Sequence, residues 1–137
     1  MNPTMTVTYQ GNLRNWAEHI KSGNTLITDA PIDNHGKGEA FSPTDLLCTS
    51  LATCMITIMG ITAESKGIQL SKVSASIEKV MYSDPRRVGE IHIVLQLSDA
   101  DYSEREKSIL ENAAMTCPVA KSLNPEIKQE VRFVYSK

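Results

Sequence analysis

The most constraining feature of this sequence is the stretch of residues 46–63, which contains no charged side chain. About 18 predominantly apolar residues are enough to span a membrane, so this segment has to be weighed against that structure first. Hydroxyl side chains and a glycine dilute its apolarity, and neither an aromatic belt nor a basic N-terminal flank marks a membrane interface. We therefore expect no membrane partner and assign the segment to a helix in the protein core or in a dimer interface.

Local signals predict where this helix begins and ends. Ser42 can cap the helix, Pro43 suits its first position, and Asp45 completes a capping-box-like pair near the positive end of the helix dipole. Gly67 favours the left-handed conformation that terminates helices, so we expect the helix to end at about Lys66.

Alternating apolar residues and turn signals predict the other elements. They indicate strands before Gly11, at 14–21 and at 25–28, a loop at 30–40, strands at 72–82 and 88–98, a helix from Ser103 to about Thr116, a short helix at 118–123 and a strand at 128–135. A Ser-Gly-Asn turn joins the second and third strands. The order β-β-β-α-β-β-α-β predicts an α+β fold in a single domain, residues 1–137.

Composition excludes several classes of partner. The chain of 137 residues has a formal net charge of -2 and its basic residues are scattered, so we expect no nucleic-acid partner. The N-terminal residues lack a basic region followed by an apolar one, which favours a cytoplasmic location. The three histidines show no ligand spacing with the cysteines and there is no phosphate-binding glycine loop, so we expect neither a metal nor another cofactor.

The three cysteines are the main candidates for chemistry. Their odd number and the absence of a CxxC motif favour free thiols over a disulfide framework. Cys54 lies inside the long helix, where it is either a buried packing residue or a thiol activated by a nearby cation. Cys48 precedes it by six residues, faces another direction on the helix, and is expected to serve packing only.

Cys117 has a local argument of its own. Pro118 can start a short helix, which places Cys117 at the N-cap, where the helix dipole and free N–H groups favour an anion. Such a position can lower a thiol pKa from about 8.5 toward 7. The alternative is a cysteine that links two helices and serves packing.

Four motifs in order carry a resemblance to a known family: Phe41-Ser42-Pro43-Thr44-Asp45-Leu46-Leu47, Leu51-Ala52-Thr53-Cys54, Asp84-Pro85-Arg86-Arg87, and Thr116-Cys117-Pro118-Val119-Ala120-Lys121-Ser122-Leu123. The chain resembles the OsmC/Ohr superfamily from end to end and is most similar to its YhfA-like members. The resemblance implies an intertwined homodimer in which a bent antiparallel sheet wraps two central helices, with two sites at the interface.

The same resemblance implies a mechanism. In the peroxidase members, the cysteine that matches Cys54 attacks the peroxide and the one that matches Cys117 resolves the sulfenic acid as a disulfide. An unidentified dithiol reductant must then reduce that disulfide. Arg14 matches the arginine of these enzymes, and His19 and Arg87 are supporting candidates. The peroxidases place a glutamate where this chain has Thr44, and the neighbouring Asp45 either substitutes for it or caps the helix.

The leading hypothesis is therefore a cysteine-based, thiol-dependent reductase of organic alkyl or fatty-acid hydroperoxides that acts in oxidative-stress defence. The alternative is a non-catalytic dimer of the same fold that binds an apolar ligand or partner at its interface, with both thiols as packing residues. A thiol hydrolase or transferase is the weakest candidate, because no general base is evident near either cysteine.

Overall fold

The computed structural model describes residues 1–137, and its contacts group them into two compact units, Met1–Leu47 and Cys48–Lys137. The elements follow in the predicted order, with a 3-10 helix, η1 (Ile32–Asn34), inside the predicted loop. The mixed α+β class is thereby confirmed. The sequence indicated one domain, and that assignment stays a prediction.

The first unit contains a three-stranded antiparallel sheet of β1 (Met5–Gly11), β2 (Arg14–His19) and β3 (Thr25–Asp29). Gly23, in the tight turn between β2 and β3, has the positive φ of 73° that such turns require. The side chains of β1 are all exposed or nearly so, including Met5, Val7 and Tyr9. An apolar strand face of this kind is typical of an interaction surface.

The second unit contains a sheet in the order β4 (Lys72–Tyr82), β5 (Arg87–Ser98) and β6 (Lys128–Tyr135). The β4–β5 pair is antiparallel, but β5 and β6 are parallel. The expectation of one bent antiparallel sheet was therefore wrong in this detail. A parallel pair needs a long crossover, and the segment with α2 (Glu104–Met115) and α3 (Pro118–Ser122) supplies it.

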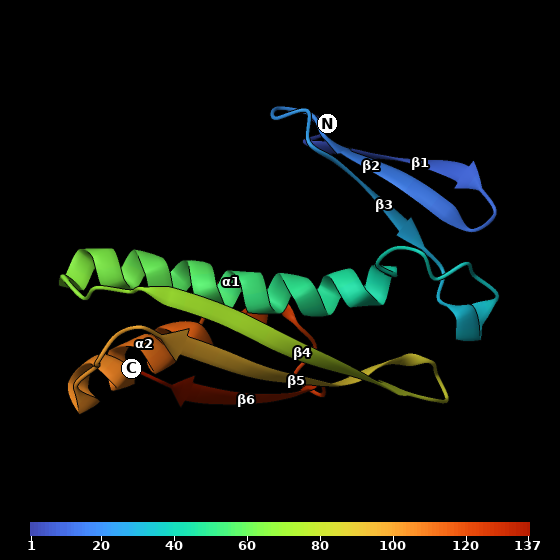
Figure 1. Ribbon diagram of the computed structural model, residues 1–137. Helices are drawn as coiled ribbons and strands as arrows, with labels where there is room; N and C mark the ends of the chain where they lie inside the picture. Colours follow the sequence, from blue (N-terminus) through green and yellow to red (C-terminus); the bar gives the residue numbers. More distant parts are fainter. The chain divides into compact units, whose positions relative to one another are not determined.

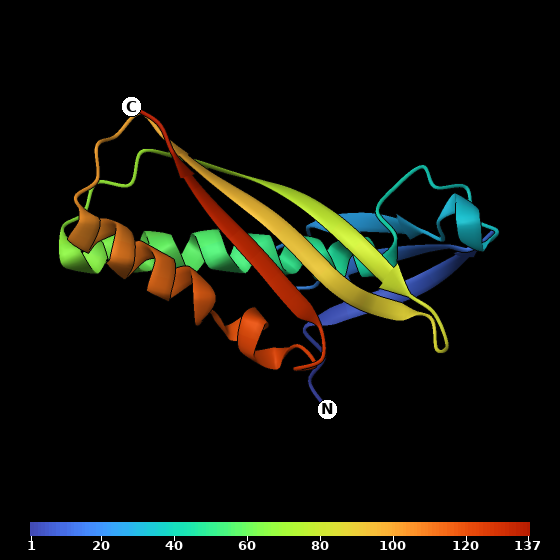
Figure 2. The same ribbon diagram turned by 90° about the horizontal axis from the view of Figure 1, so that it is seen from below.

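The core of the second unit lies between this sheet and two helices (Figures 1 and 2). Along the second half of β5 every second residue is at most 1% exposed, a pattern predicted by its alternation: Ile91, Ile93, Leu95 and Leu97. One stripe of α1 (Pro43–Lys66) packs into the same cluster with Leu110 and Ala114 of α2. Tyr135 of β6 donates a hydrogen bond of 2.6 Å to Glu111, which ties the sheet to α2.

The ends of both long helices agree with their sequence signals. The Ser42 backbone N–H donates to Asp45 Oδ2 at 2.9 Å, and the Asp45 N–H donates to Ser42 Oγ at 3.0 Å, which forms a capping box. Gly67 has φ 67°, and the Ile68 N–H bonds to the Ala63 carbonyl, as in a Schellman motif. Ser103 and Glu106 form a second capping box at α2.

Helix α1 is long and apolar enough to cross a membrane by length and composition alone, with a mean hydropathy of 1.8 over its most apolar window. Core helices of soluble proteins meet the same criterion. Six of its side chains are buried, and they lie on the stripe that packs against the core: Cys48, Leu51, Ala52, Met55, Met59 and Ala63. This packing is consistent with the core helix expected from the sequence.

Candidate functional site

Two cysteines from distant parts of the sequence pack into the same core of the second unit. Cys54 lies in the middle of α1, half-buried against the core, and Cys117 is the N-cap of α3 and is completely buried. The two thiols lie close enough that Cys54 influences the pKa of Cys117. All three cysteines are free thiols, so the pair is present in its reduced state. Cys48, as expected, is buried in the core at 2% exposure.

The electrostatic environment of Cys117 bears on the two alternatives for this residue. Burial raises the pKa of its thiol, and the neighbouring Cys54 thiol acts in the same direction. The Ala120 N–H, 3.5 Å from the sulfur, lowers the pKa, as the N-cap argument required. The desolvation effect is the larger one, so of the two alternatives for Cys117 the structure favours the packing cysteine over the thiol with a lowered pKa.

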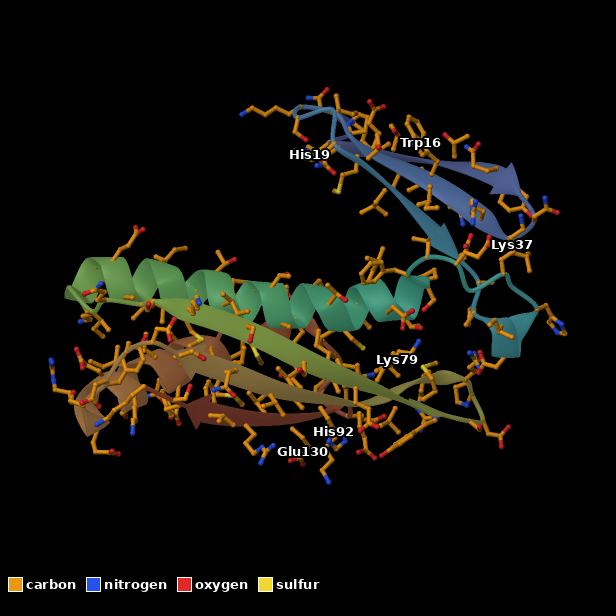
Figure 3. All side chains as sticks on the ribbon, viewed as in Figure 1. Trp16, His19, Lys37, Lys79, His92 and Glu130 are labelled. Carbon is orange, nitrogen blue, oxygen red and sulfur yellow. The ribbon has the colours of Figure 1, made fainter.

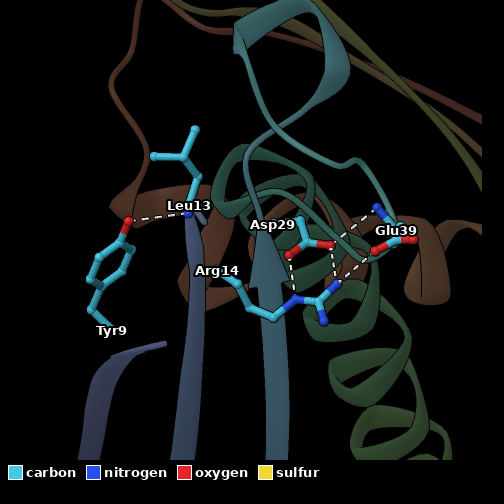
Figure 4. A network of polar contacts seen from close by, with 5 residues as sticks. All are labelled: Tyr9, Leu13, Arg14, Asp29 and Glu39. Atoms are coloured by element: carbon cyan, nitrogen blue, oxygen red, sulfur yellow. Dashed lines mark hydrogen bonds and ion pairs between the residues drawn. The ribbon is translucent and has the colours of Figure 1, made fainter. Parts of the chain in front are cut away.

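Arg14 is held by two carboxylates within the first unit (Figure 4). Its Nε donates to Asp29 Oδ1 at 2.6 Å and its Nη2 donates to Asp29 Oδ2 at 2.8 Å, a bidentate pair. Nη2 also donates to Glu39 Oε1 at 3.1 Å. Arg14 is thus an ordered, partly buried cation and not a solvated strand residue.

The structure gives the supporting candidates of the first unit other contacts. His19 Nδ1 lies 2.7 Å from Ser22 Oγ at the turn, and five residues along β2 separate it from Arg14, about 16 Å at the rise of a strand. The odd spacing also places the two side chains on opposite faces of the strand. Thr44 Oγ1 lies 3.2 Å from Ser42 Oγ, and Asp45 caps the helix.

Arg87 braces the turn between β4 and β5. Its Nη1 donates to the carbonyl oxygens of Ser83 and Pro85 at 2.9 and 2.8 Å, and the guanidinium lies over the Tyr82 ring at 5.4 Å. These contacts hold the Arg87 guanidinium at the turn, so they indicate that Arg87 stabilises the turn.

A separate hollow of about 420 Å³ lies on the outer face of the second sheet. Glu78, His92 and Glu130 occupy neighbouring positions on its three strands, and Figure 3 shows His92 and Glu130 on the side of the sheet away from α1. Neither Cys54 nor Cys117 lines this hollow. No group of three or more His, Cys, Asp or Glu side chains is arranged to hold a metal ion.

Sequence reasoning missed Asp29 and Glu39. The signal for Asp29 was present in the hairpin register, because strands paired around the Ser-Gly-Asn turn place Arg14 directly opposite residue 29. An arginine and an aspartate facing each other on adjacent strands form a favourable cross-strand pair. Glu39 lies in a loop, and no periodic pattern predicts its contact with Arg14.

Comparison with known proteins supplies the family. The family model described as OsmC-like protein matches residues 36–132. One similar structure is that of a protein from Psychrobacter arcticus 273-4, whose role in osmotic stress and the detoxification response is itself inferred. The two chains are 52% identical, and their structures superpose with a TM-score of 0.92 over 97% of this chain and 96% of that one. No curated protein matches the sequence.

Two more distant structures share the fold alone. An OsmC-like protein from Mycoplasma pneumoniae is 18% identical, with a TM-score of 0.80 over 97% of this chain and 96% of that one. A Legionella pneumophila protein described as the organic hydroperoxide resistance protein OsmC is also 18% identical, with a TM-score of 0.72 over 95% and 94%.

Proposed function

Because the chain belongs to the OsmC-like family, we propose that it is a thiol-dependent reductase of organic hydroperoxides. The observation that carries the proposal is that Cys54 and Cys117 pack into the same core, with their thiols close enough to influence each other. Two thiols that lie 63 positions apart in the sequence and share one core can pass from sulfenic acid to disulfide when their Cα atoms approach within about 7 Å. The hydroperoxide resistance function of the Legionella relative is consistent with this chemistry.

Cys54, the half-buried member of the pair, is the proposed peroxidatic residue. Its thiolate attacks the terminal oxygen of the hydroperoxide, an S–O bond forms as the O–O bond breaks, and the alkoxide leaves and takes up a proton as an alcohol. The sulfur is oxidised by two electrons to a sulfenic acid. We assign to Arg14 the positive charge that stabilises the thiolate and the leaving alkoxide.

Cys117 is the proposed resolving residue. Its sulfur attacks the sulfenic acid, an S–S bond forms, and the hydroxyl group leaves with the Cys117 proton as water. The raised pKa of Cys117 keeps its thiol protonated at neutral pH, so the proton has to leave as the S–S bond forms. An external dithiol, in the cytoplasm that we propose as the location, then returns two electrons and restores both thiols.

The proposal is tested by following the loss of thiols after reduced protein is mixed with cumene hydroperoxide. Wild type should lose two thiols in a fast phase, Cys117→Ser one, and Cys54→Ser none. Cys48→Ala is the matched control and should react like wild type, since Cys48 lies in the core. If wild type loses thiols no faster than Cys54→Ser does, the proposed activity is wrong.

The second candidate is a non-catalytic protein that binds an apolar ligand or partner. The burial of Cys117 favours it, because burial without a strong cation makes a thiol inert. Equal thiol loss in wild type and Cys54→Ser, together with a lipid retained through purification, would support this candidate over the reductase.

The proposal also includes a homodimer. Met5, Val7 and Tyr9 share one face of β1 and are 61 to 68% exposed, an arrangement that a second copy of the chain would cover. Sedimentation should give a dimer at micromolar concentration, and Val7→Asp should shift it toward the monomer. Ser74→Asp, an exposed strand position in the other sheet, is the control. A wild-type monomer would refute this part of the proposal.

A further inference from the structure

The two carboxylates that hold Arg14 are not equivalent. Asp29 is 1% exposed and contacts Arg14 through both of its oxygens, whereas the Glu39 side chain is 64% exposed and contributes one oxygen. The Glu39 backbone N–H also donates to Asp29 Oδ2 at 3.1 Å (Figure 4). Asp29 is therefore the fixed partner and Glu39 the outer one.

The strand register and the charges of the two residues both favour the Arg14–Asp29 ion pair. The two residues lie directly opposite each other on β2 and β3. The guanidinium lowers the pKa of Asp29, and Asp29 raises that of Arg14, so both remain ionised. A carboxylate without its cation would be costly at so little exposure, which strongly favours the paired orientation.

Thr44 occupies the position where the family resemblance leads one to expect an acid. Its hydroxyl contacts Ser42, and the adjacent Asp45 is engaged in the helix cap. We propose that Asp29 is the positioning residue for Arg14 and performs from β3 the task of that acid. The contacts engage Nε and Nη2 and fix the plane of the guanidinium, while Nη1 takes part in none of them.

This assignment rests on the proposed function, and a double-mutant cycle tests it. The rate of Cys54 oxidation by cumene hydroperoxide is measured for wild type, Asp29→Asn, Arg14→Gln and the double variant. Asp29→Asn should lower the rate by about tenfold to a hundredfold, because misplacement of a catalytic group by about 1 Å has effects of that size. In the Arg14→Gln background the same replacement should change nothing further.

Two further variants serve as controls for the double-mutant cycle. Glu39→Gln should lower the rate less than Asp29→Asn does, because it removes one exposed contact and keeps the backbone bond to Asp29. Asp101→Asn removes an equal charge from an exposed position and should react like wild type. The proposal is overturned if Asp29→Asn leaves the rate unchanged or lowers it equally with and without Arg14.

An NMR measurement separates this proposal from the activity itself. The Arg14 Nε–Hε signal should be resolved and protected from exchange in wild type and lost or shifted in Asp29→Asn, and Asp101→Asn should not affect it. If wild type reduces no hydroperoxide while this signal behaves as expected, the function fails and the positioning of Arg14 stands. An Arg14 signal identical in wild type and Asp29→Asn overturns the positioning, whatever the activity.

Discussion

Oxidation of the Cys54–Cys117 pair should stabilise the protein, and the size of the effect follows from the positions of the two residues. A disulfide between them closes a loop of about 63 residues in the unfolded chain. In the chain-entropy treatment such a loop lowers the free energy of folding by about 4 kcal/mol. Because the two residues already pack into the same core in the reduced protein, we expect little strain to offset this gain.

The gain can be expressed as a melting temperature. The unfolding entropy of globular proteins is about 2.1 cal/mol/K per residue, or roughly 0.29 kcal/mol/K for 137 residues. A stabilisation of about 4 kcal/mol then raises Tm by about 14 °C. Calorimetry of reduced and stoichiometrically oxidised protein, at one protein concentration, measures the difference directly.

The variants of the thiol assay supply the controls. Cys54→Ser and Cys117→Ser cannot form the bridge and should show no rise in Tm after the same treatment, whereas Cys48→Ala should behave like wild type. Mass spectrometry has to confirm the loss of two hydrogens in the oxidised sample. If the bridge forms and Tm stays unchanged or falls, the thiols are not pre-arranged and the reasoning is refuted.

Three further predictions concern stability. The raised pKa of Cys117 keeps it protonated in the folded state while the unfolded thiol ionises above about pH 8.5, so the free energy of unfolding should fall as pH rises beyond that value. Urea titrations under reducing conditions at about pH 8 and about pH 10 should show this slope in wild type and a smaller one in Cys117→Ala. Ser103→Ala removes the side-chain cap of α2 and should cost about 1 kcal/mol in urea unfolding, and a change below about 0.3 kcal/mol would contradict the capping box. Gly89→Ala would place a Cβ in overlap with the Tyr82 ring, so the ring must move, and both Tm and the Tyr82 ring NMR signals should change relative to wild type. Unchanged signals would contradict the packing.

Local features of the sequence predicted most of the elements because their causes are local. The bounds of α1 follow from Ser42, Asp45 and Gly67, whose effects reach only three or four residues along the chain. The buried face of β5 follows from strict alternation. Both helix caps and strand alternation can therefore be recognised from a few consecutive residues of the sequence.

Long-range properties could not be predicted in the same way. Nothing within residues 128–135 encodes whether that strand runs parallel or antiparallel to its neighbour. The N-cap argument for Cys117 identified a real hydrogen bond, but its burial depends on α1 and the sheet, and burial dominates its pKa. Arg14 was identified through the family resemblance, and its partner Asp29 becomes evident only when the hairpin register is known.

The parallel pairing of β5 and β6 has a consequence for the order of events during folding. The antiparallel β4–β5 hairpin joins neighbouring segments and can form early, whereas β6 pairs only after the intervening helices have crossed the sheet. Cys117 lies in that crossover and therefore reaches Cys54 late. A newly made chain would thus have its β4–β5 hairpin assembled before these two sulfurs come together.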